Sequence, residues 1–214
     1  MKKTLLLLLT ALLTASTLSA QGSDVLRRKY SQVSYGKNNF IHGDWKMKSD
    51  FAVNITNGRT FYLHEDEVAG FIRFGIDGTW TDLTYAKYTR PLVVDGNNND
   101  YKFHQLDYAL NIGPSVHFNP VDDVFVHTYF RYAPAYSLFT GDKQIYGNYA
   151  TYFVTGLSVS YNFIALGFEG RFGNCDYNNI ASAKRIEQFK PREENVLQER
   201  VKHRGWRVYL SFMF

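Results

Sequence analysis

The sequence predicts an all-β chain that folds as an antiparallel up-and-down transmembrane β-barrel of eight strands. Three observations favour this class: long runs in which apolar and polar residues alternate, an apolar alternation that reaches the last residue, and an aromatic content of 17%. Side chains of a strand alternate between its two faces, so each such run has one oily face. A tilted strand crosses a bilayer with about 9–11 residues, and several of the runs reach that length.

The C-terminal run shows the pattern most clearly. Its apolar positions are Trp206, Val208, Leu210, Phe212 and Phe214, and the opposite face carries Arg207, Tyr209 and Ser211. The ends of a chain in water usually fray, and they seldom stop on a bare aromatic residue. An oily face that continues to the terminal Phe therefore favours a strand whose outer side meets lipid.

The middle of the chain repeats this alternation. At 106–118 the even positions are apolar from Leu106 to Phe118, the odd positions are small or polar, and Asn119-Pro120-Val121-Asp122 then forms a tight turn. In all, including the two runs just described, spans of this kind occupy 45–56, 69–85, 103–118, 123–138, 148–162, 164–174 and 204–214. These seven spans require an eighth, because bacterial single-chain barrels have an even number of strands.

Two segments can supply the missing span. The preferred one is 25–35, followed by a loop at 36–44, although Arg27-Arg28-Lys29 makes it the least oily span. The alternative is a hairpin turn at Asn57-Gly58 that leads into 59–64, a run too short to cross a bilayer. With the first choice, 57–68 becomes a long connection.

The polar face of these runs distinguishes a barrel from a water-soluble β-sandwich, which also alternates. In a sandwich the polar face meets water and carries mostly charged residues. Here that face is rich in Gly, Ala and Ser interspersed with Arg, Asp and Glu, which is typical of a narrow lumen. The charges expected in the lumen are Lys46, Lys48, Asp50, Arg73, Asp77, Asp107, Arg131, Glu169, Arg171 and Arg207.

Because buried charges must be paired, we expect these groups to form an ion-pair network. Its predicted members are Arg73, Asp77, Asp107, Arg131, Glu169, Arg171 and Arg207. Eight strands leave an interior just wide enough for side chains, so a continuous conducting path is sterically disfavoured.

The N-terminus resembles a secretory signal. Lys2 and Lys3 precede the apolar run at 5–13, and small residues up to Ala20 follow. We expect a signal peptide at 1–20 and a barrel at 21–214; a membrane anchor is the alternative, but it normally needs about 20 apolar residues.

The single cysteine, Cys175, excludes an intrachain disulfide, and it is either a small apolar residue or a reactive exposed thiol.

Loop lengths suggest an orientation. The short turns are 119–122 and 162–163, and the long loops are 36–44, 86–101, 139–147 and 175–203. The two sets alternate along the chain, and barrels of this kind have their longer loops on the cell surface. The mixed charges of 175–203 indicate either a solvated surface or contacts with lipid phosphates.

Catalytic and metal-binding patterns are weak. The six histidines are scattered, and neither a metal nor a cofactor is expected. His117 and His127, with Ser115 or Thr128 as a neighbouring hydroxyl, are the candidates for a lipid-modifying enzyme, and His104 is an alternative base. A hydroxyl beside a histidine is common by chance, and His104 has no clear nucleophile beside it, so we expect a protein that is not an enzyme.

The terminal alternation ending in Phe214 resembles the assembly signal of outer-membrane barrels, although many versions carry Gly where this chain has Tyr209. With its alternation and turn spacing, the chain resembles the small eight-stranded outer-membrane proteins of Gram-negative bacteria, the OmpX-like and OmpA-barrel-like group. The resemblance implies export to the outer membrane, insertion by the barrel assembly machinery, and a monomer in contact with outer-membrane lipid and lipopolysaccharide, with no nucleic-acid partner. It implies a structural or surface-interaction role through the loops; a lipid-modifying enzyme or a narrow pore are the alternatives.

Overall fold

The computed structural model describes residues 26–42, 45–94, 97–121, 123–141, 144–179 and 200–214. Within them, eight long strands are β1 (Arg27–His42), β2 (Trp45–Tyr62), β3 (Ile72–Val94), β4 (Asn97–Val121), β5 (Val124–Gly141), β6 (Gln144–Tyr161), β7 (Ile164–Asp176) and β9 (Arg200–Met213). A two-residue strand, β8 (Asn178–Asn179), pairs with β6. The predicted signal peptide at 1–20 lies outside the described residues.

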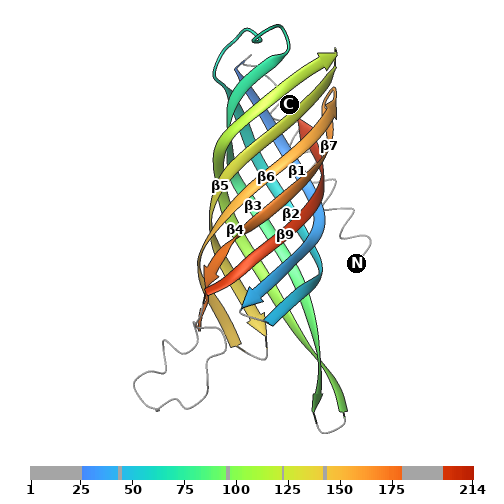
Figure 1. The fold of residues 1–214 in the computed structure, drawn as a ribbon, viewed down its shortest axis with the longest axis vertical. Helices are drawn as coiled ribbons and strands as arrows, with labels where there is room; N and C mark the ends of the chain where they lie inside the picture. Colours follow the sequence, from blue (N-terminus) through green and yellow to red (C-terminus); the bar gives the residue numbers. More distant parts are fainter. Residues whose placement is uncertain (1–25, 43–44, 95–96, 122, 142–143, 180–199) are drawn as a thin grey trace.

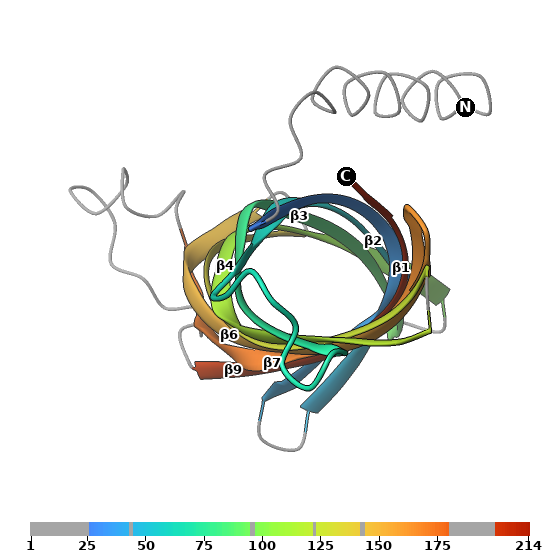
Figure 2. The ribbon, with the colours of Figure 1, turned by 90° about the horizontal axis from the view of Figure 1, so that it is seen from above.

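The long strands form a closed antiparallel barrel, as predicted (Figures 1 and 2). Each pairs with its neighbours in the chain, and β1 pairs with β9 from Tyr30↔Met213 to Ile41↔Lys202. Closure pairs both edges of every long strand along the body of the barrel, which a sandwich cannot do. None of the described residues forms a helix long and apolar enough to cross a membrane.

The strands place their oily residues outside and their polar residues inside. Trp80, Ile112 and Leu166 expose 55%, 58% and 62% of their surface, whereas Arg131 is fully buried. Such an inverted arrangement is stable where the surroundings of the barrel are hydrocarbon.

The first strand and its connection follow the preferred prediction. The span at 25–35 corresponds to β1, and the alternative hairpin at Asn57-Gly58 is wrong, because both residues lie inside β2 opposite Ser31 and Tyr30. Gly58 is needed for packing: a Cβ there would lie 2.5 Å from the hydroxyl oxygen of Tyr30. The connection to β3 is shorter than expected, since β2 continues to Tyr62.

The predicted spans were too short at the end with the long hairpins. Most of the predicted loop at 36–44 belongs to β1, and most of the loop at 86–101 belongs to a β3–β4 hairpin that projects beyond the rest of the barrel (Figure 1). Backbone ladders pair polar residues as well as apolar ones, so the strands continue where the oily pattern stops. Hydropathy marks the lipid-facing part of a strand rather than its full length.

The start of β2 corrects the predicted faces. Met47 is buried in the lumen, whereas Lys46 and Lys48 are exposed on the outer face, opposite to the expectation. Asp50 is exposed as well, and it accepts a hydrogen bond from Thr89. The pairing of β2 with β3 shifts between Ser49 and Phe51, and a bulge of this kind reverses which alternate residues point inward.

Candidate functional site: the polar lumen

A buried set of charged residues occupies the middle of the lumen, and we call it the central network. It consists of Asp77 and Asp82 of β3, Asp107 of β4, Arg131 of β5, Glu169 and Arg171 of β7, and Arg207 of β9. All seven are less than a tenth exposed. Four acids therefore face three guanidinium groups in a space that is largely closed to water.

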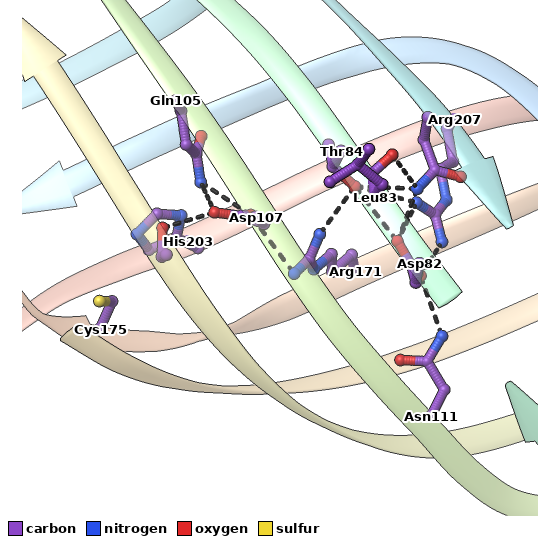
Figure 3. A network of polar contacts seen from close by, with 12 residues as sticks. Asp82, Leu83, Thr84, Gln105, Asp107, Asn111, Arg171, Cys175, His203 and Arg207 are labelled. Carbon is purple, nitrogen blue, oxygen red and sulfur yellow. Dashed lines mark hydrogen bonds and ion pairs between the residues drawn. The ribbon is translucent and has the colours of Figure 1, made fainter. Parts of the chain in front are cut away.

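Arg207 joins three strands in this network. Its Nε donates to Glu169 on the neighbouring strand β7, and its Nη2 lies 2.8 Å from Oδ2 of Asp82 on β3. Asp82 also accepts a hydrogen bond from Asn54 at 2.6 Å. It accepts another from Asn111 at 2.9 Å, and Figure 3 shows this residue beside it. Because β3 and β9 are separated by β1 and β2 in the ring, this contact crosses the lumen.

A second ion pair joins β5 to β3. Arg131 donates to Oδ2 of Asp77, with its Nη2 at 2.5 Å, and Thr60 donates to Oδ1 of the same carboxylate at 2.6 Å. The guanidinium carbon of Arg131 lies 3.5 Å from the centre of the Tyr129 ring. This stacking supplies a cation–π contact in addition to the ion pair.

A third group lies around Asp107. Its carboxylate is 3.3 Å from Nη2 of Arg171 and accepts hydrogen bonds from Ser137 at 2.5 Å and Gln105 at 2.9 Å. Arg171 also donates to Thr84 at 3.2 Å, as Figure 3 shows. The carboxylate thus has several donors, which is the condition for keeping a charge buried.

The structure brings together six of the seven predicted network residues. The seventh, Arg73, lies apart from them near the short-turn end, 3.5 Å from Glu67, with 28% of its side chain exposed. Asp82 belongs to the network but was missed, because a bulge between Thr79 and Asp82 changes the inward positions of β3 from odd to even. The spacing of the apolar residues indicates this change: they recur at every second position up to Ile76, whereas Leu83 follows Trp80 after an interval of three positions.

Beyond the central network, the end with the long hairpins is filled by rings, and we call this set the aromatic cluster. Its members are Phe40, Tyr88, Phe139, Tyr177 and His203, with the partly buried Phe103 against them. Phe40 lies at its centre, with ring centroids 4.3 Å from His203 and 5.0 Å from Phe139. Cys175 is buried beside these rings, 1% exposed, so it is a small packed residue and not an exposed thiol.

At the short-turn end, two of the predicted histidines meet. The rings of His117 and His127 are 4.0 Å apart, and Nε2 of His127 lies 3.2 Å from Asp77. The hydroxyl of Tyr62 is 2.9 Å from Nδ1 of His117. Both histidines are buried.

The hydroxyls expected beside these histidines are placed differently. Thr128 is exposed on the outer face and donates to the carbonyl of Gly156, and the buried hydroxyl of Ser115 has no hydrogen-bond partner among the described residues. His104 lies on the strand face away from the lumen, with Nδ1 at 2.7 Å from the Tyr85 hydroxyl. Among the hydroxyls of the described residues, only that of Tyr62 is therefore in hydrogen-bond contact with His117 or His127.

Two cavities between described lumen side chains are small. One cavity beside Arg207 and Asn54, and another beside Asp107 and His203, each measure about 10 Å³. Such a volume holds about one water molecule. Among the described residues, no group of three or more His, Cys, Asp or Glu is arranged to bind a metal ion.

The predicted assembly signal lies on the outer face of β9. Trp206, Val208, Leu210 and Phe214 are 38–43% exposed and Phe212 is partly exposed. Tyr209 points inward and its ring covers Gly167 of β7, where a Cβ would lie 2.3 Å from the ring. Many assembly signals have glycine at this position, whereas this chain has Tyr209, and its side chain fills part of the lumen.

No family model matches the chain, and no curated protein sequence matches it. Among solved structures it is similar to Ail, the attachment invasion locus protein of Yersinia pestis, in complex with the heparin analogue sucrose octasulfate (TM-score 0.47, 10% identity, covering 88% of this chain and 99% of that chain). It is also similar to Neisserial surface protein A (0.47, 12%, 87% and 97%) and to the outer membrane protease OmpT from Escherichia coli (0.49, 8%, 88% and 96%). The similarity concerns the general architecture, a closed antiparallel barrel of the kind found in small outer-membrane proteins.

Proposed function

We propose that this protein is an integral outer-membrane β-barrel that serves a structural or surface-interaction role and does not conduct solutes. The observation that carries the proposal is the central network, in which Arg207 spans the lumen from β9 to β3. A side chain that crosses the interior and is bonded on both sides obstructs passage. Any molecule that the protein contacts would then bind to its outer surface or to its ends.

The outer surface supports a location in lipid. Large apolar residues such as Trp80, Leu166 and Phe168 are more than half exposed on the outer face of the strands. Exposure of apolar surface to water costs about 25 cal/mol for each Å², and soluble monomers rarely expose patches beyond a few hundred Å². We therefore propose the outer membrane as the location, with outer-membrane lipid and lipopolysaccharide as contacts.

Export and assembly follow from the two ends of the chain. We propose that 1–20 is removed as a signal peptide and that the barrel assembly machinery recognises the apolar face of β9, ending in Phe214. Cell fractionation tests the location: the protein should sediment with outer membranes and migrate faster on gels before heating than after. A protein recovered dissolved in the periplasm, with one mobility, would contradict it.

Planar-bilayer recording tests the closed lumen. Purified protein whose folded state is verified by its heat-dependent gel migration should give no steady channel current. Reproducible unitary conductance from such preparations would show an open path and overturn this part of the proposal.

Enzymatic modification of lipid is tested separately. Cells producing the wild-type protein and cells producing a variant with His104, His117 and His127 changed to Ala should have identical lipid A by mass spectrometry. A lipid A species that requires the wild-type histidines would establish the enzyme instead.

A further inference from the structure

Basic side chains gather on the outer face of three neighbouring strands, at the end of the barrel with the long hairpins. They are Lys37 of β1, Lys46 and Lys48 of β2, and Lys202 and Arg204 of β9, and all five are exposed. Strands β2, β1 and β9 adjoin in that order in the barrel wall (Figure 1). We call these five residues the basic patch.

The register of the strands aligns the basic patch in rows. Asn39 of β1 pairs with Lys48 on one side and with Arg204 on the other. In the next row, Ile41 pairs with Lys46 and Lys202 in the same way. Neighbouring strands lie about 4.8 Å apart, so the two cations of a row have backbones roughly 10 Å apart. Flexible Lys and Arg side chains at that separation can reach one headgroup between them.

Among the described residues, no carboxylate neutralises the charges of the basic patch. In the part of the chain that the structure describes, none of the five residues forms an ion pair with a carboxylate. Asp50 follows Lys46 and Lys48 on β2, but it contacts residues of β3 instead. Its carboxylate is 3.8 Å from Lys87 and accepts a hydrogen bond from Thr89. The other exposed cation of β9, Arg200, lies 3.9 Å from Asp176 and is not part of the patch.

The basic patch borders the oily surface, and Lys37 of the patch pairs with Trp206 at that border. Along β9 the outward residues change from Lys202 and Arg204 to Trp206 and Val208. Val208 is level with Tyr35 of β1, which in turn pairs with Val53 of β2, so the boundary continues across all three strands. Cations placed immediately beyond an apolar band lie at the depth of lipid headgroups.

The basic patch also occupies only one side of the barrel. Strands β5, β6 and β7 contain two basic residues among their described positions, Arg131 and Arg171, and both point into the lumen. At the corresponding end, the outward residues of β5 and β7 include Thr140, Asn174 and Asp176, and β6 exposes the apolar Ile145. Lys87 of β3 and Lys102 of β4 add further cations on the strands that follow β2, so among the described positions it is β5, β6 and β7 that lack an outward Lys or Arg at this end.

We infer that the basic patch binds the phosphate groups of an anionic lipid in the leaflet around the long-hairpin end of the barrel. The inference rests on the proposed membrane location and adds a specific lipid site to it. Ammonium and guanidinium groups bind phosphate oxygens through charge-assisted hydrogen bonds. Each cation near an anionic membrane surface strengthens binding roughly fivefold, so several together give a marked preference.

Native mass spectrometry of the purified full chain tests this site. The protein is released from nanodiscs of phosphatidylcholine alone, or of phosphatidylcholine mixed with diphosphorylated lipid A or with phosphatidylglycerol, and the retained lipids are counted. The variant K46Q/K48Q/K202Q/R204Q keeps the size and polarity of most side chains while removing four charges. Lys102→Gln, an exposed cation of β4 outside the patch, is the matched control.

We expect wild type and Lys102→Gln to retain the phosphate-bearing lipids over phosphatidylcholine, and the quadruple variant to lose that preference by more than about tenfold. Preference for lipid A over phosphatidylglycerol would identify a multiply phosphorylated headgroup, and added inorganic phosphate should compete only weakly with either. If wild type and the quadruple variant are both inserted and heat-modifiable and retain the phosphate-bearing lipids equally, the proposed lipid site is overturned. The proposed membrane location would not be affected by that result. A wild-type protein that does not enter any nanodisc would instead contradict the proposed function.

Discussion

The central network and the aromatic cluster fill the same lumen by different physical means. In the central network, charged groups on distant strands pair across the interior, as Arg207 does with Asp82 at 2.8 Å. In the aromatic cluster, rings pack around Phe40 at centroid distances of 4.3–6.0 Å. Loss of a group from the first leaves an unpaired buried charge, whereas loss from the second leaves a cavity. The comparison shows that the lumen of a narrow barrel can be filled by either means.

The largest effect is expected from Arg207→Ala. This change leaves Glu169 and Asp82 buried without their shared cation, and breaking a buried ion pair costs about 3–5 kcal/mol. Urea unfolding in detergent, followed by heat-dependent gel migration, measures the loss. Arg200→Ala is the control, because its ion pair with Asp176 is exposed and should contribute little. Equal effects of the two changes would contradict the role given to the central network.

A smaller effect is expected from Phe139→Ala in the aromatic cluster. Removing a buried ring costs about 3 kcal/mol when a cavity remains, and water entering from the nearby end of the barrel can reduce that cost. The same unfolding measurement applies, with Phe130→Ala as the control, since its ring is 46% exposed on the outer face. A loss larger than that of Arg207→Ala would reverse the ranking of the two regions.

Gly167→Ala should have the smallest of the three effects and separates packing from charge. The added methyl would lie 2.3 Å from the Tyr209 ring, and overpacking of this kind costs about 1–3 kcal/mol. In a double-mutant cycle with Tyr209→Ala, the two losses should not add, because the smaller side chain removes the clash. Additive losses would show that the ring and the glycine are not coupled.

The fold followed from hydropathy because lipid and lumen impose opposite demands on alternate residues. The same reasoning failed where a bulge changes the alternation. Asp82 was missed beyond the bulge in β3, and the outward side chains of Lys46 and Lys48 were assigned to the lumen before the bulge in β2. A bulge is a feature of the pairing between two strands. In the sequence of one strand it is visible only as an irregular spacing of the apolar residues.

The aromatic cluster was not predicted for a related reason. Phe40, Phe139 and Tyr177 fall in segments that the sequence analysis assigned to loops, because the oily alternation ends before them. High aromatic content suggests residues at membrane interfaces, and many of these rings do lie outside. Which rings turn inward depends on how far each strand continues past the lipid, and hydropathy does not record that length.

The position of Arg207 on the last strand has a consequence for biosynthesis. Asp82 and Glu169 are translated well before the guanidinium group that neutralises both of them. Until β9 docks between β7 and β1, those two carboxylates lack the cation that they share. The barrel therefore gains this interior counter-charge in the same step that closes the ring of strands, and a chain that lacks β9 lacks the cation shared by Asp82 and Glu169.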